Sequence, residues 1–235
     1  NFVVSVLAGR VTGDTEDVLG IAPKAKVVAA GSLGDDGSGE LEEILKGIAY
    51  AADQGAKVIN VSAGGPIKPK DLAKLNKAPL WDKLEKKGVL IVCAAGNSHT
   101  DLDKQPVFPA SLPRPNVISV MATDASGQPA RMKGQQAGEW RAFSNYGKRT
   151  VDIAAPGALI LGIPARDKTT LWDGTSFAAP MVTGAAALVW GEHPEWGYKR
   201  VKRAVLESAE RVEPLEGRCR TGALLDLEAA LNWEP

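Results

Sequence analysis

The chain has 235 residues, 44% of them hydrophobic and 24% charged, a balance that is ordinary for one globular domain with a buried core. Its 28 Lys and Arg residues equal its 28 Asp and Glu residues, so no net field would draw it toward nucleic acid, a membrane surface or acidic ligands. The longest apolar stretches, such as 89–95, are too short to cross a bilayer.

In the first part of the chain, short apolar runs typical of strands alternate with a pattern typical of a helix. Residues 26–30 read as a short buried strand, and a loop rich in Gly, Asp and Ser follows at 31–39. From 40 to 54 apolar residues recur at helical spacing, and Gly55 fits a helix C-cap. Residues 57–61 then predict a second strand.

The middle of the chain continues the alternation. Residues 71–87 predict a helix that Pro79 interrupts, and the apolar run 89–95 predicts a strand. Two further strands are expected at 117–122 and 151–154. The two cysteines, Cys93 and Cys219, are too few to form a disulfide framework, whether or not they pair with each other.

Three helices are expected to close the chain, at 176–191, 198–207 and 226–231. Nearly all-apolar strands that alternate with helices indicate a parallel sheet covered by helices on both faces. We therefore predict an α/β fold with three layers, in which the sheet is mostly parallel.

The segment 173–190 places a serine at the start of a helix rich in small residues. The hydroxyl of Ser176 would lie beside unpaired backbone N–H groups and the positive end of the helix dipole. This environment favours negative charge on a bound substrate oxygen. Gly-Thr-Ser alone is better explained as a helix cap, but a cap does not explain the whole string.

Two other strand ends carry candidate site residues. The strand before Asn97 ends in Gly-Asn, whose amide could face a reacting carbonyl, although a simple turn explains that dipeptide equally well. Residues 58–66 form a strand that breaks into small residues, where an extended peptide could add as a strand. The loop 34–39 could form the opposite side of such a groove, or both segments could be plain connections.

Together these segments resemble the subtilisin family of serine proteases, the subtilases. The serine string resembles the family's serine motif, and Ala94–Asn97 resembles its oxyanion-hole motif. Further landmarks match in the family's order, at 20–23, 58–66, 152–157, 193–196 and 221–226. The resemblance covers essentially the whole chain and implies the family's three-layer fold.

The resemblance also implies roles for individual residues. Ser176 would be the nucleophile, and the side chain of Asn97 and the backbone N–H of Ser176 would hold the oxyanion. The implied substrate-binding residues form two groove walls and the pocket before the scissile bond: Ser38, Gly39, Ser62, Ala63, Gly64, Ala94, Ala95 and Gly96.

The Asp and His of the family's triad precede the serine in chain order, and neither is recognisable here. The only histidines are His99 and His193, and both stand outside the family's position for the base. Residues 3–9 resemble the second half of the family's His motif. We therefore expect residues 1–235 to be a subtilase catalytic domain that lacks its Asp- and His-bearing N-terminal segment.

Two functions remain open on this basis. The favoured one is a serine endopeptidase whose Asp and His come from an upstream segment or a companion chain, this chain alone being inactive. The alternative is an inactive pseudoprotease that binds peptides or proteins. An α/β-hydrolase esterase is disfavoured, because Gly174–Ala178 is not Gly-x-Ser-x-Gly.

The expected partner is a polypeptide substrate, with neither nucleic acid nor a membrane. No cofactor is certain. Subtilases often bind structural calcium, but no Asp-rich ligand loop stands out, so a metal remains undecided. The resemblance also implies a secreted or periplasmic location.

Overall fold

The structure is a computed structural model that describes residues 2–9, 18–34, 39–134, 138–163 and 169–234. Ser38, which the resemblance placed in a groove wall, lies outside the described residues. The rest of the predicted site lies within them.

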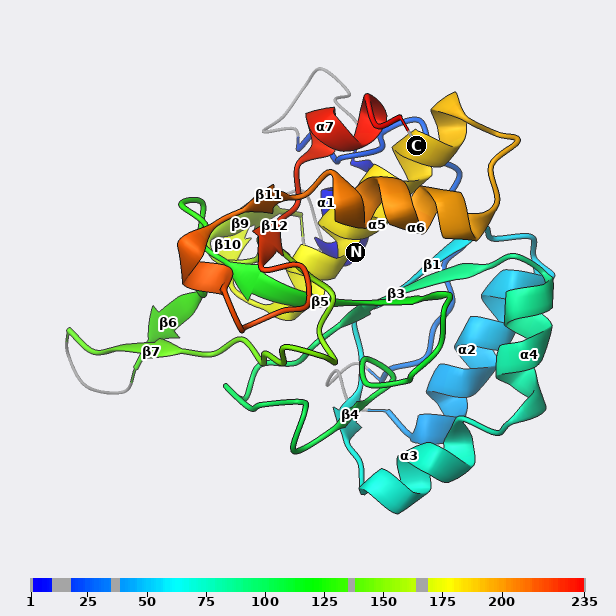
Figure 1. Cartoon of the computed structure of the whole chain (residues 1–235), viewed down its shortest axis with the longest axis horizontal. Coiled ribbons are helices and arrows are strands. Elements are labelled where there is room, and N and C mark those ends of the chain that lie inside the picture. Colours follow the sequence, from blue (N-terminus) through cyan, green and yellow to red (C-terminus); the bar gives the residue numbers. More distant parts are fainter. Residues whose placement is uncertain (1, 10–17, 35–38, 135–137, 164–168, 235) are drawn as a thin grey trace.

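The centre of the molecule is a six-stranded sheet in the order β1-β3-β5-β8-β12-β11 (Figure 1). Its strands are β1 (Val58–Val61), β3 (Leu90–Ala94), β5 (Val117–Thr123), β8 (Ile153–Pro156), β12 (Ala223–Leu224) and β11 (Glu210–Arg211). All neighbours are parallel except β11 and β12. Every residue of β3 and β5 is buried, as expected of parallel strands covered on both faces.

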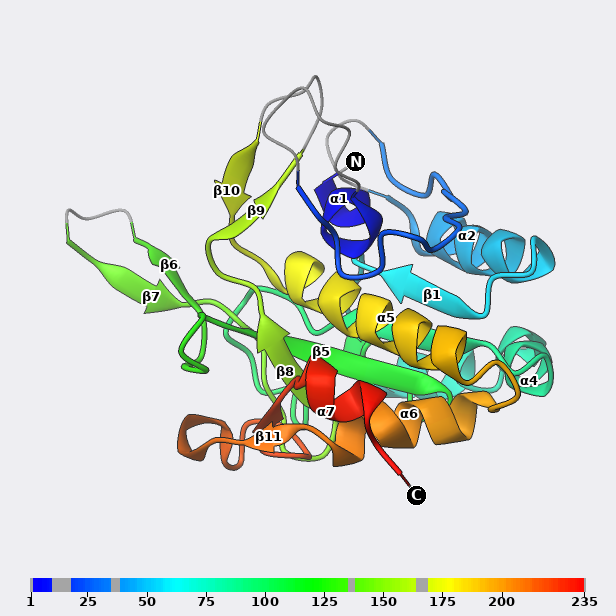
Figure 2. The ribbon, with the colours of Figure 1, turned by 90° about the horizontal axis from the view of Figure 1, so that it is seen from above.

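Helices cover both faces of this sheet, which confirms the predicted three-layer α/β fold (Figure 2). One face carries α2 (Leu41–Asp53), α3 (Pro69–Leu75) and α4 (Pro79–Lys86), and the other carries α5 (Thr175–Glu192), α6 (Tyr198–Glu207) and α7 (Leu227–Leu231). Trp81 and Leu84 of α4 belong to the first core cluster, and Val182 and Val201 belong to the second.

Helix α5 is the central helix of its layer, because it contacts four of the six strands as well as α6 and α7. It is apolar around most of its circumference, and several of its buried residues have small side chains: Ala178, Ala179, Gly184, Ala185 and Ala186. Small side chains allow a helix to approach the sheet closely. The packing therefore fixes the N-terminus of α5, where Ser176 lies.

The remaining elements are short and lie around this frame. Three two-stranded ladders pair β2 (Gly65–Pro66) with β4 (Val107–Phe108), β6 (Arg131–Lys133) with β7 (Trp140–Ala142), and β9 (Ile160–Gly162) with β10 (Thr170–Trp172). A 3₁₀ turn spans Glu213–Leu215. Helix α1 (Phe2–Ala8) packs against α5 and β9. Such short elements carry too few residues for a periodic sequence signal.

The prediction of a buried strand at 26–30 is wrong. These residues have no strand partner in the described part of the chain, and Val27 and Val28 are 45% and 38% exposed. A strand needs the backbone of a neighbour for its hydrogen bonds. Strand β1 pairs with β3 alone, so its other edge is also open among the described residues.

The other predicted elements are confirmed within a few residues, including the break in the helical segment at Pro79, which begins α4. Cys93 and Cys219 are buried and unpaired. Within the ranges that the structure describes, no helix combines the length and apolar character needed to cross a membrane.

Candidate active site

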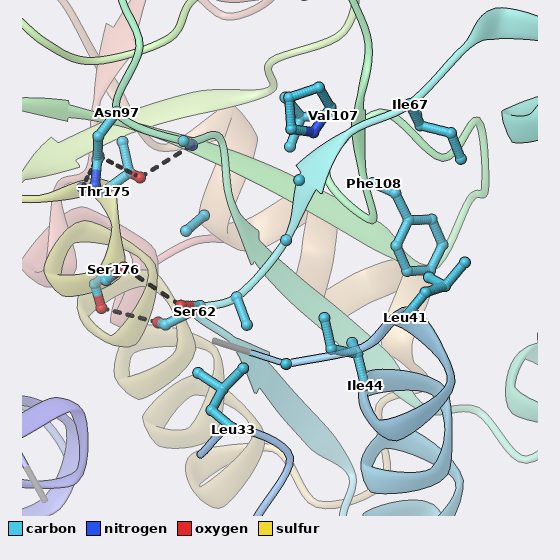
Figure 3. A pocket seen from close by; sticks show the side chains of 17 residues that line it. Leu33, Leu41, Ile44, Ser62, Ile67, Asn97, Val107, Phe108, Thr175 and Ser176 are labelled. Carbon is cyan, nitrogen blue, oxygen red and sulfur yellow. Dashed lines mark hydrogen bonds between the residues drawn. The ribbon is translucent and has the colours of Figure 1, made fainter. Parts of the chain in front are cut away.

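A cleft of about 580 Å³ lies between the N-terminus of α5 and the loops that follow β1 and β3 (Figure 3). Its polar end contains Ser62, Asn97, Thr175 and Ser176. In a parallel sheet, the carboxyl ends of neighbouring strands meet at one edge, and ligands commonly bind there. The residues come from distant parts of the sequence and meet at this edge because β1 and β3 are neighbours.

Ser176 is half-buried and is tied to the loop after β1 (Figure 3). Its Oγ donates a hydrogen bond to the carbonyl oxygen of Ser62 at 3.3 Å, and Ser62 Oγ donates to the carbonyl oxygen of Ser176 at 2.8 Å. Asn60 Nδ2 donates to Ser62 Oγ at 2.9 Å, and Thr183 Oγ1 of α5 donates to Asn60 Oδ1 at 3.0 Å. This chain of polar groups joins β1 to α5 beneath the serine.

Asn97 is held by the residue that precedes the serine. Its Oδ1 accepts hydrogen bonds from the backbone N–H and the hydroxyl of Thr175, both at 2.9 Å. The same hydroxyl accepts a bond from the Gly96 N–H at 3.0 Å. With Oδ1 engaged, the Nδ2 of Asn97 is the group that remains to meet an acceptor in the cleft.

Most of the predicted substrate-binding residues line this cleft. Those within the described ranges that do so are Gly39, Ser62, Ala63, Gly64, Ala94 and Gly96. Ala95 is not among the residues that line the cleft: it is 0% exposed and belongs to the core cluster on the α2 side of the sheet. Successive residues of a strand point to opposite faces, and Ala95 accordingly belongs to the other core cluster than Ala94.

Sequence analysis missed the apolar end of the cleft. Its side chains come from four separate segments: Leu33, Leu41, Ile44, Ile67, Val107 and Phe108. The ladder between β2 and β4 brings the last three beside the loop after β1. Gly64 is required for this approach, because a Cβ there would lie 2.2 Å from the Phe108 carbonyl oxygen. Of these side chains, only Leu41 and Ile44 stood out in the sequence. Their helical spacing indicated packing in the core and gave no sign of a cleft.

Neither histidine of the chain is placed as a base for Ser176. His193 follows the last residue of α5, at the end of the helix opposite Ser176, and its ring stacks on Trp196 at 3.9 Å. An 18-residue helix is about 27 Å long. The His99 ring lies against Tyr146, with 5.4 Å between centroids. Among the described residues, no hydrogen bond joins either imidazole to Ser176.

The start of α1 lies close to the serine. The ring of Phe2 packs against that of Phe177, with 4.5 Å between centroids, and Phe177 follows Ser176 directly. Phe2 also stacks on Trp172 at 5.3 Å. The first residue of α1 therefore lies beside the N-terminus of α5.

A model described as the subtilase family matches residues 4–223. The chain belongs to the subtilase family. Among curated relatives, thermitase from Thermoactinomyces vulgaris is 35% identical over 184 residues, and subtilisin E from Bacillus subtilis is 34% identical over 186. These alignments cover 78% and 79% of this chain, but only 58% of thermitase and 44% of subtilisin E.

Solved structures of subtilases are similar over 98% of the chain. The protease domain of PatA has a TM-score of 0.77 at 29% identity, with 78% of that chain covered. The prenylagaramide maturation protease PagA has a TM-score of 0.76 at 30% identity, with 80% covered. The family and the fold that the motifs indicated are therefore confirmed.

The described residues include no group of three or more His, Cys, Asp or Glu side chains that could hold a metal ion. The polar end of the cleft presents hydroxyl, amide and backbone N–H groups. These groups suit a reaction in which a serine attacks and N–H donors receive negative charge.

Proposed function

We propose that this chain forms most of the catalytic domain of a serine endopeptidase, with Ser176 as its nucleophile. A base takes the proton of Ser176 Oγ as that oxygen bonds to the carbonyl carbon of the scissile peptide, and the same proton passes to the nitrogen as the C–N bond breaks and the amine leaves. Water then hydrolyses the acyl-enzyme ester, which releases the acid and returns the proton to Ser176. Asn97 Nδ2 and the Ser176 N–H would hold the oxyanion. The observation that carries the proposal is that Ser176 lines the same cleft as Asn97, an amide whose oxygen is already engaged by Thr175.

The proposed substrate is an extended polypeptide. The cleft has a polar end at the serine and an apolar end about Leu33, Leu41 and Phe108, so a peptide lying along it would place an apolar side chain at the second end. Leu33 and Leu41 at this end are 45% and 39% exposed. Covering them would add to the binding free energy.

We further propose that the base His and its orienting Asp come from an upstream segment or a companion chain. Three observations support this: β1 has an open edge, the apolar residues 26–30 have no strand partner among the described residues, and Phe2 lies against Phe177. A strand beside β1 and a residue just before α1 would both reach the cleft. Residues 1–235 alone would then be inactive, and the parent protein would be exported, as its family suggests.

The second candidate function is a pseudoprotease that binds peptides in the same cleft. It is favoured by one specific observation: the rings of both histidines pack against aromatic residues, and among the described residues neither is hydrogen-bonded to Ser176. The two functions differ in whether Ser176 reacts.

Labelling with a fluorophosphonate tests the choice. The full-length parent protein, the 235-residue chain and the parent with Ser176→Ala would be treated with the probe, and intact masses measured. We expect one adduct on the parent at Ser176, and none on the other two samples. A parent that binds peptides yet gains no adduct would support the pseudoprotease instead.

A further inference from the structure

Asn145 lies beneath the loop that carries Asn97. The side chain and backbone of this residue, which is 1% exposed, make four hydrogen bonds to residues 95–100, here termed the oxyanion loop. Its partners lie on both sides of Asn97: Ala95 O (2.8 Å, from Nδ2), Gly96 O (2.8 Å, from the backbone N–H), Ser98 N (3.0 Å, to Oδ1) and Thr100 N (2.8 Å, to Oδ1). One side chain thus satisfies three backbone groups of a six-residue loop.

Asn145 is itself held by the sheet. The preceding residue, Ser144, accepts a hydrogen bond from the backbone N–H of Ala122 in β5 at 2.8 Å. The Ser144 hydroxyl donates in turn to the carbonyl oxygen of Asn145 at 2.9 Å. The backbone of Asn145 is therefore anchored, through Ser144, to a central strand of the sheet. Central strands are among the most rigid parts of a fold.

The oxyanion loop closes tightly over this amide. Gly96 has φ of +102°, a conformation that L side chains rarely adopt. A Cβ on Gly96 would lie 2.5 Å from Asn145 Nδ2. The residue before Asn97 is thus in contact with Asn145, and a shift of one would move the other.

The side chain of Asn97 is therefore fixed from two directions. Thr175 of α5 engages its Oδ1, while Asn145 fixes the backbone on either side of it. An oxyanion donor must be placed before the reaction, because stabilisation depends on donors already aimed at the developing charge.

We propose that Asn145 is a positioning residue that holds the oxyanion loop so that Asn97 Nδ2 faces the oxyanion; this inference rests on the proposed peptidase function. Only a carboxamide fits the contacts, because one atom must donate to Ala95 O while another accepts two N–H groups. Aspartate has the acceptor but no donor. Glutamine is one methylene too long for a fully enclosed site.

The test is a double-mutant cycle in the full-length parent protein, with wild type, Asn97→Ala, Asn145→Ala and the double variant. Loss of one oxyanion donor lowers kcat about 10²–10³-fold in subtilisin, itself a relative of this chain. We expect Asn145→Ala to lower kcat about 10- to 100-fold with KM within about twofold, because it misplaces that donor. In the Asn97→Ala background the same change should cost less than about threefold.

Asn116→Ala is the matched control. Asn116 is also a fully buried amide, and its Nδ2 donates to Val89 O at 2.8 Å, but it lies at the opposite end of β5. It should lower thermal stability as Asn145→Ala does and leave the kcat of the folded enzyme within about twofold. Asn145→Ser would replace the alanine variant if that variant fails to fold. Equal losses of kcat in both Asn97 backgrounds would overturn the proposal.

A crystal structure of the Asn145→Ala parent separates this inference from the proposed function. Displacement of the Asn97 amide supports positioning even if the wild-type parent hydrolyses no peptide, an outcome that would defeat the peptidase proposal alone. An Asn97 amide that keeps its place in the variant would overturn the positioning role, whatever the parent catalyses.

Discussion

At the scale of single residues, the cleft depends on side chains that hold other groups in place. Thr175 is 0% exposed, and its hydroxyl both accepts from Gly96 N–H and donates to Asn97 Oδ1. Ser62 similarly joins the loop after β1 to the carbonyl oxygen of Ser176. Each hydroxyl meets groups from two elements, so its loss would leave buried polar groups without partners.

We expect Thr175→Val to destabilise the fold by about 1–3 kcal/mol, because a buried N–H loses its acceptor while the side-chain volume is kept. In the parent protein kcat should also fall, by about tenfold, because Asn97 Oδ1 keeps the bond from the Thr175 N–H but loses the bond from the Thr175 hydroxyl. Denaturant unfolding and steady-state kinetics measure the two effects. Thr175→Ser keeps the hydroxyl and should keep kcat near the wild-type value; an equal drop in kcat for both variants would contradict this role.

At the scale of elements, two loops far apart in sequence are joined through the half-buried carboxylate of Asp103. Asp103 follows the oxyanion loop, and its carboxylate accepts hydrogen bonds from the Thr150 hydroxyl at 2.7 Å and the Thr150 N–H at 2.9 Å. Burial raises the pKa of Asp103, but the bonds from Thr150 and Arg149 outweigh it and hold that pKa below the usual 3.8. The carboxylate thereby ties the loop before β4 to the turn before β8.

The lowered pKa sets the sign of a pH effect. Ionised Asp103 stabilises the folded state at pH above about 3.8, and this contribution is lost as the pH falls through the lower folded-state pKa. We therefore expect Asp103→Asn to cost about 1–3 kcal/mol at pH 7 and progressively less below pH 3.8. Urea unfolding at pH 7, 5 and 3 measures it.

Glu42→Gln serves as the comparison, because Glu42 forms only an exposed pair with Lys46 on α2. Its unfolding midpoint should stay close to that of the wild type at every pH. A loss for Asp103→Asn that is constant from pH 7 to 3 would show that the charge of Asp103 does not stabilise the fold.

At the scale of the whole molecule, the part of the chain that the structure describes leaves the β1 edge of the sheet without a further strand. Among the described residues β1 has a single neighbour, β3, and the extended segment 26–30 exposes Val27 and Val28. Exposed strand edges readily accept a further strand, since their N–H and C=O groups lack partners. An added strand at this edge would lie beside the cleft, as the proposed function requires.

Hydrogen exchange tests that arrangement. We expect amides of β1 and of residues 26–30 to exchange more slowly in the parent protein than in the 235-residue chain, because an added strand would supply their hydrogen-bond partners. Helices α6 and α7 lie away from β1 (Figure 2), so peptides from them should exchange alike in both samples. Equal exchange at β1 would mean that no strand pairs there.

The sequence alone was sufficient for the features that depend on local pattern. Apolar runs located β3 and β5, helical spacing located α2, and Pro79 marked the start of α4, because each signal lies within one segment. The motifs around Ser176 and Asn97 were likewise continuous, so both residues could be named before the cleft that they share was known. Family membership followed from these strings.

Tertiary structure decided what depends on neighbours. Residues 26–30 resemble a buried strand in composition, but a strand exists only where another backbone pairs with it. Ala94 and Ala95 are neighbours in sequence, yet Ala94 lines the cleft while Ala95 is buried in the core. The pairing of β2 with β4 brings Phe108 to the cleft. Asn145 gave no local signal, since its importance lies in hydrogen bonds to a loop distant in sequence. Local patterns encode elements, whereas a site arises where elements meet.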